Sequence, residues 1–384
     1  FGMSTTYDVI VIGGGMAGAS VSFELAADHR VLVLEGEEQP GYHATGRSAA
    51  AYIPSYGVDN PALRTLTTAS RALLESPPAE FHEGSFLQRR GLLSLAQREC
   101  IDELKALYES QASAIPDIEW VDGDFLKASI PLLQESYLDG AIFERGVFDI
   151  DVHGLHEAYL NGLKQRGGRC ETNAPVQAIN RSGGAWHIKA GTASYSAPVV
   201  INAAGAWADT LATLAGVATV GIQPLRRTAI LLETPTQTES WPLVMETSEG
   251  FYFKPDAGLL LVSPADETES PACDAAPEEI DIAYAAHYAE QALDIQVRQV
   301  KHSWAGLRSF APDRTPVIGF DEAAEGFFWM AGQGGHGIQI APATAALAAA
   351  LVRGSDLPDS LTEQGFDTAW VAPGRFQSKA RALA

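Results

Sequence analysis

Residues 7–18 read Tyr-Asp-Val-Ile-Val-Ile-Gly-Gly-Gly-Met-Ala-Gly, an apolar strand that runs into a glycine turn and the start of a helix. Gly13 suits the tight turn, and Gly15 lets the backbone approach a pyrophosphate. Gly18 allows close packing of the helix on the strand, while the free N–H groups of the first helical turn face the phosphates. The stretch therefore predicts a dinucleotide-binding βαβ unit.

The residues that follow agree with this prediction. The helix after the turn carries an apolar face of Ala17, Val21 and Leu25, and a second apolar strand, 30–34, ends in Glu35. An acidic residue about 20 positions beyond the glycines is suited to bind the two hydroxyl groups of a ribose.

Composition excludes several classes of function. The 384 residues suit about two domains, and the balance of Lys+Arg 26 against Asp+Glu 48 gives a net charge of −22. That charge argues against nucleic acid and against an anionic membrane surface as partners.

The cysteines stand far apart without a CxxC pair, which is typical of reduced thiols in a cytoplasm rather than of a disulfide frame or a zinc site. The longest apolar stretch, 341–352, is too short to span a bilayer. No positively charged leader precedes the first strand, so we expect no signal peptide and a cytoplasmic location.

Two further segments have the character of a nucleotide-binding domain. An apolar strand at 198–202 runs into a small-residue turn, and a glycine-rich turn at 332–337 precedes a helix to about Arg353. Between them, residues 219–307 are rich in alternating strand patterns, as expected of a β-rich insertion. The expected fold class is α/β, with a discontinuous Rossmann-like domain of the glutathione-reductase type and an inserted α+β domain on a mainly antiparallel sheet. The expected division is 3–85, 150–218 and 308–384 for the first domain, and 86–149 and 219–307 for the second.

The chain has only one GxGxxG turn. A nicotinamide-dependent dehydrogenase would use one such motif, and a flavoprotein that accepts electrons from NADPH would carry a second. If the cofactor is FAD, the electrons must therefore come directly from the substrate.

Four blocks together resemble the D-amino-acid oxidase/glycine oxidase superfamily of FAD enzymes, and within it the bacterial D-amino-acid dehydrogenases of the D-arginine dehydrogenase kind. The resemblance extends over about residues 6–355. The blocks are Gly13–Gly18 with Glu35, then 41–50, then 202–207, and finally 306–319 with Gly334–Gly337.

The resemblance implies non-covalent FAD, because relatives that attach FAD covalently use a cysteine just before the last glycine block and no cysteine follows Cys273. It places segment 45–50 against the isoalloxazine and the helix after Gly337 with its N-terminus at the flavin N1–C2=O edge, where reduction leaves negative charge. The implied cofactor-binding residues are Gly13, Gly15, Met16, Ala17, Gly18, Glu35, Thr45, Arg47, Ser48, Ala49, Ala50, Val176, Ala203, Ala204, Gly205, Trp207, Gly332, Gly334, Gly335, His336, Gly337, Ile338 and Gln339.

The substrate residues follow from the same resemblance. Arg308 matches the arginine that binds the α-carboxylate, for which a planar guanidinium is suited because it can bind both oxygens. Tyr252 matches a tyrosine that assists the carboxylate, and Tyr56 a lid tyrosine over the substrate. Arg227 resembles a second active-site arginine, although Arg226 beside it is an open alternative. Contacts with the substrate are also expected from Gly335 and Gln339.

Three departures from the family pattern point to an apolar side-chain pocket. Relatives that take cationic D-amino acids carry an acid where this chain has Leu92, a histidine where it has Ala51 and a threonine where it has Ile53. A buried guanidinium without a counter-charge is strongly disfavoured. We therefore expect apolar side chains rather than arginine or lysine.

No metal site is expected. Asp149, Asp151, His153 and His156 could be drawn as a cluster, but Asp151 is placed to cap a helix and the two histidines lie on that helix at i, i+3.

The predicted function is FAD-dependent oxidation of D-amino acids to imines, which water hydrolyses to 2-oxo acids. A glycine or sarcosine-type amine oxidase, a 2-hydroxy-acid dehydrogenase and a non-catalytic flavin-binding subunit remain alternatives. The expected partners are a small-molecule amino acid and either oxygen or a quinone as electron acceptor, with the oligomeric state open.

Overall fold

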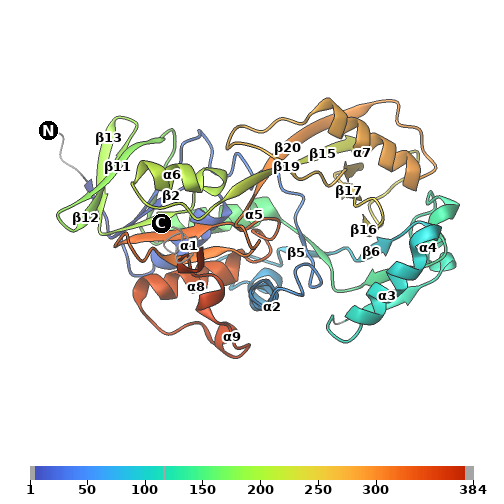
Figure 1. Ribbon diagram of the computed structural model, residues 1–384, viewed down its shortest axis with the longest axis horizontal. Helices are drawn as coiled ribbons and strands as arrows, with labels where there is room; N and C mark the ends of the chain where they lie inside the picture. The colour runs from blue at the N-terminus through green and yellow to red at the C-terminus, as the bar shows by residue number, and fades with distance from the viewer. Residues whose placement is uncertain (1–4, 116, 377–384) are drawn as a thin grey trace.

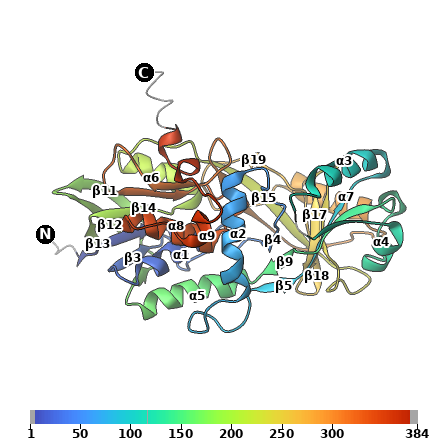
Figure 2. The same cartoon turned by 90° about the horizontal axis from the view of Figure 1, so that it is seen from below.

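The computed structural model describes residues 5–115 and 117–376. A parallel sheet covered by helices forms one half of the elongated molecule, and a large mixed sheet forms the other (Figure 1). Helix α2 (Pro61–Glu75) lies at the border between the two halves (Figure 2).

The parallel sheet is built around the strand that opens the glycine turn. Its strands are parallel except the last one, which pairs antiparallel with its neighbour. The order across the sheet is β10 (Arg169–Glu171), β3 (Val31–Leu34), β2 (Val9–Ile12), β14 (Val199–Asn202), β22 (Phe327–Ala331) and β21 (Val317–Phe320).

The central strands are continuously apolar because both faces of this sheet are covered. Val9 and Val11 pack with α1, α2 and α8, whereas Ile10 and Ile12 pack with α6 and a second, smaller sheet. The helices of this half are α1 (Met16–Leu25), α5 (Val152–Gln165), α6 (Ala208–Leu214), α8 (Ala341–Arg353) and α9 (Asp359–Thr362). The smaller sheet has the order β1 (Thr5–Thr6), β13 (Ala193–Ala197), β12 (Ala185–Ala190) and β11 (Val176–Ser182).

Side-chain caps fix the starts of α2 and α5, of which the sequence predicts the one at Asp151. The Asn60 side chain accepts a hydrogen bond from the Leu63 N–H, with Pro61 at the first helical position of α2. The Asp151 carboxylate accepts from the Gly154 N–H and begins α5. These contacts satisfy backbone donors that have no partner inside the helix.

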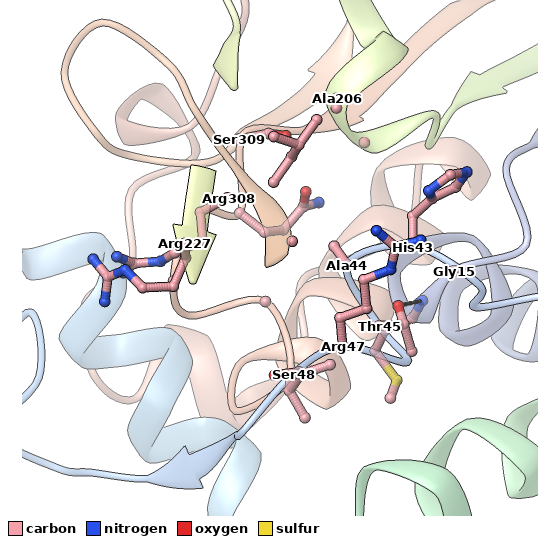
Figure 3. Close-up of a pocket in the computed structure, with 18 of the residues that line it drawn as sticks. Gly15, His43, Ala44, Thr45, Arg47, Ser48, Ala206, Arg227, Arg308 and Ser309 are labelled. Atoms are coloured by element: carbon pink, nitrogen blue, oxygen red, sulfur yellow. Dashed lines mark hydrogen bonds between the residues drawn. The ribbon is translucent and has the colours of Figure 1, made fainter. Parts of the chain in front are cut away.

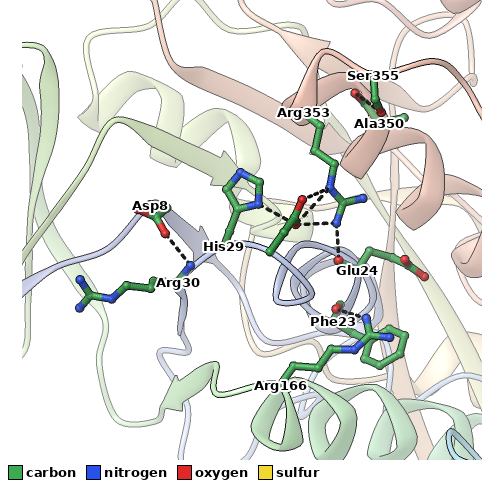
Figure 4. A network of polar contacts seen from close by, with 10 residues as sticks. Asp8, Phe23, Glu24, His29, Arg30, Arg166, Ala350, Arg353 and Ser355 are labelled. Carbon is green, nitrogen blue, oxygen red and sulfur yellow. Dashed lines mark hydrogen bonds and ion pairs between the residues drawn. The ribbon is translucent and has the colours of Figure 1, made fainter.

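The C-terminal end of α1 is held by two arginines from other helices (Figure 4). Arg353 of α8 donates to the Glu24 carbonyl and pairs with Asp28, and Arg166, which follows α5, donates to the Phe23 carbonyl. Positive charge at a helix C-terminus is favourable because the last carbonyls there lack partners. The network fixes α1, whose N-terminal end carries the glycine turn.

The large mixed sheet is mainly antiparallel, with one parallel pairing between β16 and β6. Helix α7 packs on one face of it, in a core that includes Ile230, Phe253 and Ala289. The strand order is β19 (Thr268–Glu269), β15 (Gln223–Leu232), β18 (Leu259–Ser263), β17 (Tyr252–Asp256), β16 (Leu243–Glu246), β6 (Leu92–Leu95), β8 (Ala141–Glu144) and β7 (Ile118–Val121), and β20 (Val300–Phe310) also pairs with β15.

The remaining elements lie around these sheets. A small sheet has the order β4 (Ala51–Tyr52), β9 (Phe148–Ile150) and β5 (Leu87–Arg89). The helices of the second half are α3 (Ile101–Gln111), α4 (Gly123–Ser129) and α7 (Glu279–Ala292), and short 3₁₀ turns occur at Arg98–Cys100, Glu135–Tyr137, Gly205–Trp207 and Thr368–Trp370.

The predicted division into domains stays a prediction, although the sheets follow it closely. Strands of the parallel sheet come from the first set of segments, and those of the large sheet come from the second, except that β20 crosses the predicted boundary at 308. Residues 3, 4, 116 and 377–384 of the predicted segments lie outside the described residues. Among the described residues, no helix is long and apolar enough to cross a membrane.

Candidate active site

A cavity of about 970 Å³ extends from the glycine turn to the face of the large sheet. Gly15, Thr45 and Arg47 line it on the side of the parallel sheet, and Arg227 and Arg308 line it on the side of the large sheet (Figure 3). Both halves of the molecule therefore contribute to one site.

Close backbone approach explains the first and last glycines of the turn. Gly13 has φ +106°, and a Cβ on it would overlap the carbonyl of Ala203 in the neighbouring strand connection. A Cβ on Gly18 would overlap the Gly13 carbonyl oxygen, so Gly18 packs α1 against the turn and does not line the cavity. A side chain at either position would separate the helix from the strand.

Side chains hold the turn in place. The Met16 N–H at the start of α1 donates to Thr45 Oγ1 at 2.9 Å. The Glu35 carboxylate lines the cavity and accepts from the Gly14 N–H at 2.8 Å and the Glu37 N–H at 2.9 Å. Glu35 is thereby fixed at the end of β3, where the sequence predicts a ribose contact.

His156, which sequence reasoning set aside as part of an unconvincing metal cluster, supports this turn. It is buried on α5, and its Nε2 lies 2.8 Å from the Gly14 carbonyl oxygen. Burial lowers the pKa of His156, so the ring is neutral and Nε2 carries the donor hydrogen. Gly41 passes so close that a Cβ there would stand 2.9 Å from His156 Cε1. His153, three residues earlier on the same helix, is exposed and lies near Glu157.

The other predicted cofactor residues fall into two groups. Gly332 forms a left-handed turn at φ +72° and His336 is buried beneath Tyr56, and neither lines the cavity. The residues that line it are Gly13, Gly15, Met16, Ala17, Glu35, Thr45, Arg47, Ser48, Ala49, Ala50, Val176, Ala203, Ala204, Gly205, Trp207, Gly334, Gly335, Gly337, Ile338 and Gln339.

The two predicted arginines reach the cavity because of strand register. On β20, Trp304, Gly306 and Arg308 share one face of the strand and line the cavity, and Leu307 and Ser309 near the end of the strand line it as well. Arg227 on β15 pairs with Gly306, so its side chain lies on the same face. Arg226 points to the other face, where it pairs with Glu278 and Asp281 of the α7 region. Of the two arginines, Arg227 is thus the one that lines the cavity.

Arg308 sits at the centre of a polar cluster. Its Nη2 donates to the Tyr56 hydroxyl, and its Nη1 donates to Glu267 Oε1 at 3.0 Å. Burial lowers the pKa of Arg308 from its ordinary value. The charge at this position is therefore only partly solvated, which strengthens its attraction for an anion.

Glu267, which sequence reasoning missed, joins the arginines. Its Oε1 also accepts from Arg227 Nη2 at 3.2 Å and from Arg314 Nη2 at 2.9 Å. Burial opposes ionisation of Glu267, but the hydrogen bond from Arg314 and the charges of Arg308, Arg314 and Arg227 outweigh it and lower its pKa. One carboxylate shared by several arginines leaves the cluster cationic.

The predicted apolar wall is present, with one residue in a different place. Ala51, Ile53, Tyr56 and Tyr252 line the cavity. Leu92 is buried behind them, in an apolar cluster with Ile53, Val147 and Leu243, so it does not face the cavity. Strand β6 is central in the large sheet and is covered at this point. Leu243 and Met245 of the adjacent strand β16 form the part of the wall that faces the cavity at this point.

Gln339 lines the cavity but its amide is engaged in the fold. Oε1 accepts from the Ile53 N–H at 3.1 Å, and Nε2 donates to Thr67 Oγ1 at 2.9 Å. The residue therefore joins the start of α8 to residues 53–57, the lid segment that carries Tyr56.

The sequence contains some signals for the residues that were missed. Residues on one face of a strand recur at every second position, so counting back from Arg308 and Gly306 would have identified Trp304. Counting forward from Leu243 in the same way would have identified Met245. Glu267 and His156 have no such signal, because their contacts join segments far apart in the chain.

Comparisons with known proteins identify the family and the fold of the chain. Residues 8–351 match the family described as DAO, FAD dependent oxidoreductase. The chain is 28% identical to glycine oxidase of Geobacillus kaustophilus (strain HTA426), covering 91% of this chain and 94% of that protein. It is 26% identical to the hydrogen cyanide synthase subunit HcnC of Pseudomonas aeruginosa, covering 100% and 99%. The crystal structure of the Geobacillus kaustophilus glycine oxidase superposes with a TM-score of 0.83 at 25% identity, covering 96% of this chain and 98% of that one. These findings confirm the expected fold class.

Proposed function

This chain belongs to the DAO family of FAD-dependent oxidoreductases, and from this premise we propose that it oxidises the Cα–N bond of D-amino acids with apolar side chains. The observation that supports the proposal is a cavity with partly buried Arg308, Arg227 and Tyr252 at one end and an apolar wall beside them. A bound amino acid would place its carboxylate at the arginines and Tyr252 and its side chain against the apolar wall.

The residues of the cavity fit FAD. Glu35 and Val176, the bare backbone of Gly13 and Gly15, and Gly337 and Ile338 before α8 all line it. A Cβ on Gly15 would crowd Thr45 Oγ1 at 3.2 Å, so the turn is tightly packed at this glycine. We expect the binding to be non-covalent. When bound, FAD supplies an acceptor for a hydride at N5.

The protein residues then act by positioning the substrate. Arg308 and Arg227 bind the α-carboxylate, and the hydroxyl of Tyr252 assists them. The cationic cluster also favours the neutral form of the amine, because positive charges nearby lower the pKa of an ammonium group. Tyr56 closes over the carboxylate from the lid segment. Fixing one end of a small molecule in this way directs its Cα–H along a single path.

Met245 and Leu243 are the wall residues that a larger side chain would meet. Burying each additional methylene against them is worth ~0.8 kcal/mol, whereas a guanidinium or ammonium without a partner loses its hydration there. D-leucine, D-methionine and D-phenylalanine are therefore expected to be better substrates than D-arginine and D-lysine.

The second candidate is oxidation of glycine or another small secondary amine, which is favoured by the 28% identity to a glycine oxidase. The same arginines would hold the carboxylate of glycine, and the apolar wall would be left without a substrate group to cover.

A panel of D- and L-amino acids, glycine, sarcosine and D-2-hydroxy acids separates these candidates. Bleaching of the flavin without oxygen measures turnover of the substrate, and peroxide formation in air reports whether oxygen is the acceptor. Fastest reduction by D-leucine or D-phenylalanine supports the proposal, and fastest reduction by glycine or sarcosine supports the second candidate. Reduction by D-arginine ahead of all others would contradict the apolar pocket.

Arg308→Met tests the carboxylate site directly. Loss of a charge-assisted contact of this kind costs ~2–5 kcal/mol, so kcat/KM for the best amino acid is expected to fall at least ~30-fold while FAD stays bound. A fall of less than about fivefold would show that Arg308 does not hold the carboxylate, since 1.4 kcal/mol is a factor of ten.

A further inference from the structure

Tyr56 is held between two side chains that come from different parts of the chain. Its ring stacks on the His336 ring with centroids 4.1 Å apart and planes at 20°, and its hydroxyl accepts from Arg308 Nη2. His336 thus contacts the ring and Arg308 the hydroxyl of the same side chain.

His336 makes few polar contacts for a buried imidazole. It is 7% exposed, and among the described residues its Nε2 has no hydrogen-bond partner. Burial, with the charges of Arg308 and Arg314, lowers the pKa of His336 to about 3, so the ring is uncharged near neutral pH. A neutral ring can stack beside an arginine cluster without adding to its positive charge.

Backbone hydrogen bonds and close packing surround His336. Its N–H donates to the Gln333 carbonyl, and its own carbonyl accepts from the Ile340 N–H just before α8. On the side of the lid, Gly57 has φ +78°, and a Cβ there would stand 2.9 Å from His336 Nε2. The lid segment therefore packs directly on the histidine, and Ser55 next to Tyr56 is tethered by its N–H and Oγ to Glu144 at 3.0 and 2.5 Å.

We propose that His336 is a positioning residue: its ring supports Tyr56 so that the Tyr56 hydroxyl stays within hydrogen-bond reach of Arg308. Arg308 is thereby kept in one orientation for a carboxylate. The inference rests on the proposed function, in which Arg308 binds the α-carboxylate of the substrate. His336 thereby strengthens the binding of the carboxylate although it does not touch the substrate.

The test uses the holoenzyme with benzoate as a simple carboxylate probe, whose binding is followed by the change in flavin absorption. An aromatic contact of this kind accounts for about three- to tenfold in affinity, so His336→Ala is expected to raise the Kd of benzoate by about that factor. His336→Phe, which keeps a flat ring, is expected to restore a Kd close to the wild-type value. For the best amino acid, the alanine variant should raise KM and change kcat less.

A double-mutant cycle with Tyr56→Phe shows whether the effect passes through the tyrosine hydroxyl. If His336 acts by holding that hydroxyl, His336→Ala should change the Kd of benzoate by less than about twofold in the Tyr56→Phe background. Equal effects of His336→Ala in both backgrounds, or an equal loss in the alanine and phenylalanine variants, would overturn the proposal. Bound FAD and Tm are measured for each variant, and His336→Leu replaces the alanine variant if the latter does not fold.

An Arg308→Met arm separates this inference from the proposed function. If Arg308→Met leaves benzoate binding unchanged, the proposed carboxylate site is wrong. If Arg308→Met weakens benzoate binding and His336→Ala does not, only the role of His336 is wrong.

Discussion

Gly335 lies directly against the guanidinium of Arg308: a Cβ on Gly335 would overlap Arg308 Nη2 and would stand 2.6 Å from the Tyr56 hydroxyl oxygen. The absence of a side chain at position 335 is therefore a condition for the observed orientation of Arg308. Because the overlapping atom is at the end of a flexible side chain, a methyl group at 335 would displace the guanidinium rather than the backbone.

Gly335→Ala is expected to leave the fold and bound FAD intact and to lower kcat/KM at least ~10-fold, mainly through KM, because a displaced guanidinium loses its charge-assisted contact with the carboxylate. Steady-state kinetics with the best amino acid measures the effect. Gly146→Ala is the control, since the nearest atom to a Cβ there is Pro54 Cγ at 3.9 Å. Unchanged kinetics in Gly335→Ala would mean that Arg308 reaches the carboxylate from another orientation.

His156→Ala is expected to weaken FAD binding without a large effect on turnover at saturating FAD. The substitution removes the donor to the Gly14 carbonyl and leaves a space beside Gly41. The hydrogen bond contributes ~0.5–1.5 kcal/mol, so the Kd of FAD should rise a few-fold or more when apoprotein is titrated with FAD. His153→Ala, on the exposed face of the same helix, is the control and should leave the Kd unchanged. Equal Kd values in the two variants would show that His156 does not support the turn.

Acid precipitation is expected to release all of the flavin as FAD, which is measured by absorption of the supernatant and of the washed pellet. Cys273 is the one cysteine among the described residues that lines the cavity, and it lies in contact with Ser270 Oγ at 3.6 Å. Cys273→Ser therefore provides the decisive control. Flavin that stays in the wild-type pellet but leaves that of Cys273→Ser would establish a covalent bond through this thiol.

Glu144→Gln is expected to raise Tm, and to raise it more as the pH increases. Burial raises the pKa of Glu144, so the folded protein binds this proton more tightly than the unfolded chain does. The buried charge therefore does not lower the free energy of unfolding when the pH is below the ordinary pKa, and it lowers it most when the pH is above the pKa in the folded protein. The destabilisation by Glu144 thus grows with pH. Glutamine keeps an acceptor for Ser55 without the charge.

Thermal unfolding from about pH 4 to about pH 8 measures the difference in Tm between Glu144→Gln and the wild type. The exposed Glu109 of α3 provides the control substitution, Glu109→Gln, which should give a difference that does not change over this range. A difference that shrinks with rising pH would show that the Glu144 carboxylate is stabilised in the fold.

Leu92→Glu is expected to destabilise the protein rather than to change its specificity. Leu92 is buried behind the cavity wall among Ile53, Val147 and Leu243, and an unpaired carboxylate in such a place is costly. The position for a specificity change is Met245, which lines the cavity opposite Tyr252 in the strand register. Met245→Glu should raise kcat/KM for D-arginine relative to D-leucine, and Tm measured on both variants distinguishes the two effects.

The sequence alone was sufficient for the features that depend on neighbours in the chain. The glycine turn with Glu35, the cap at Asp151 and the apolar strand before the turn all correspond to the structure within a residue or two. Each depends on a backbone conformation or a side-chain bond over a few positions, so each leaves a local pattern.

Only the tertiary structure decided which of these residues meet. Alternation along β15 places Arg226 and Arg227 on opposite faces, but only the packing of α7 on one face leaves Arg227 at the cavity. Leu92 is hidden because a neighbouring strand and the lid segment cover it. His336 beneath Tyr56, and Glu267 shared by Arg227, Arg308 and Arg314, join segments that are distant in the chain. Such contacts depend on how the sheets and the lid segment pack together, so a local sequence pattern does not predict them.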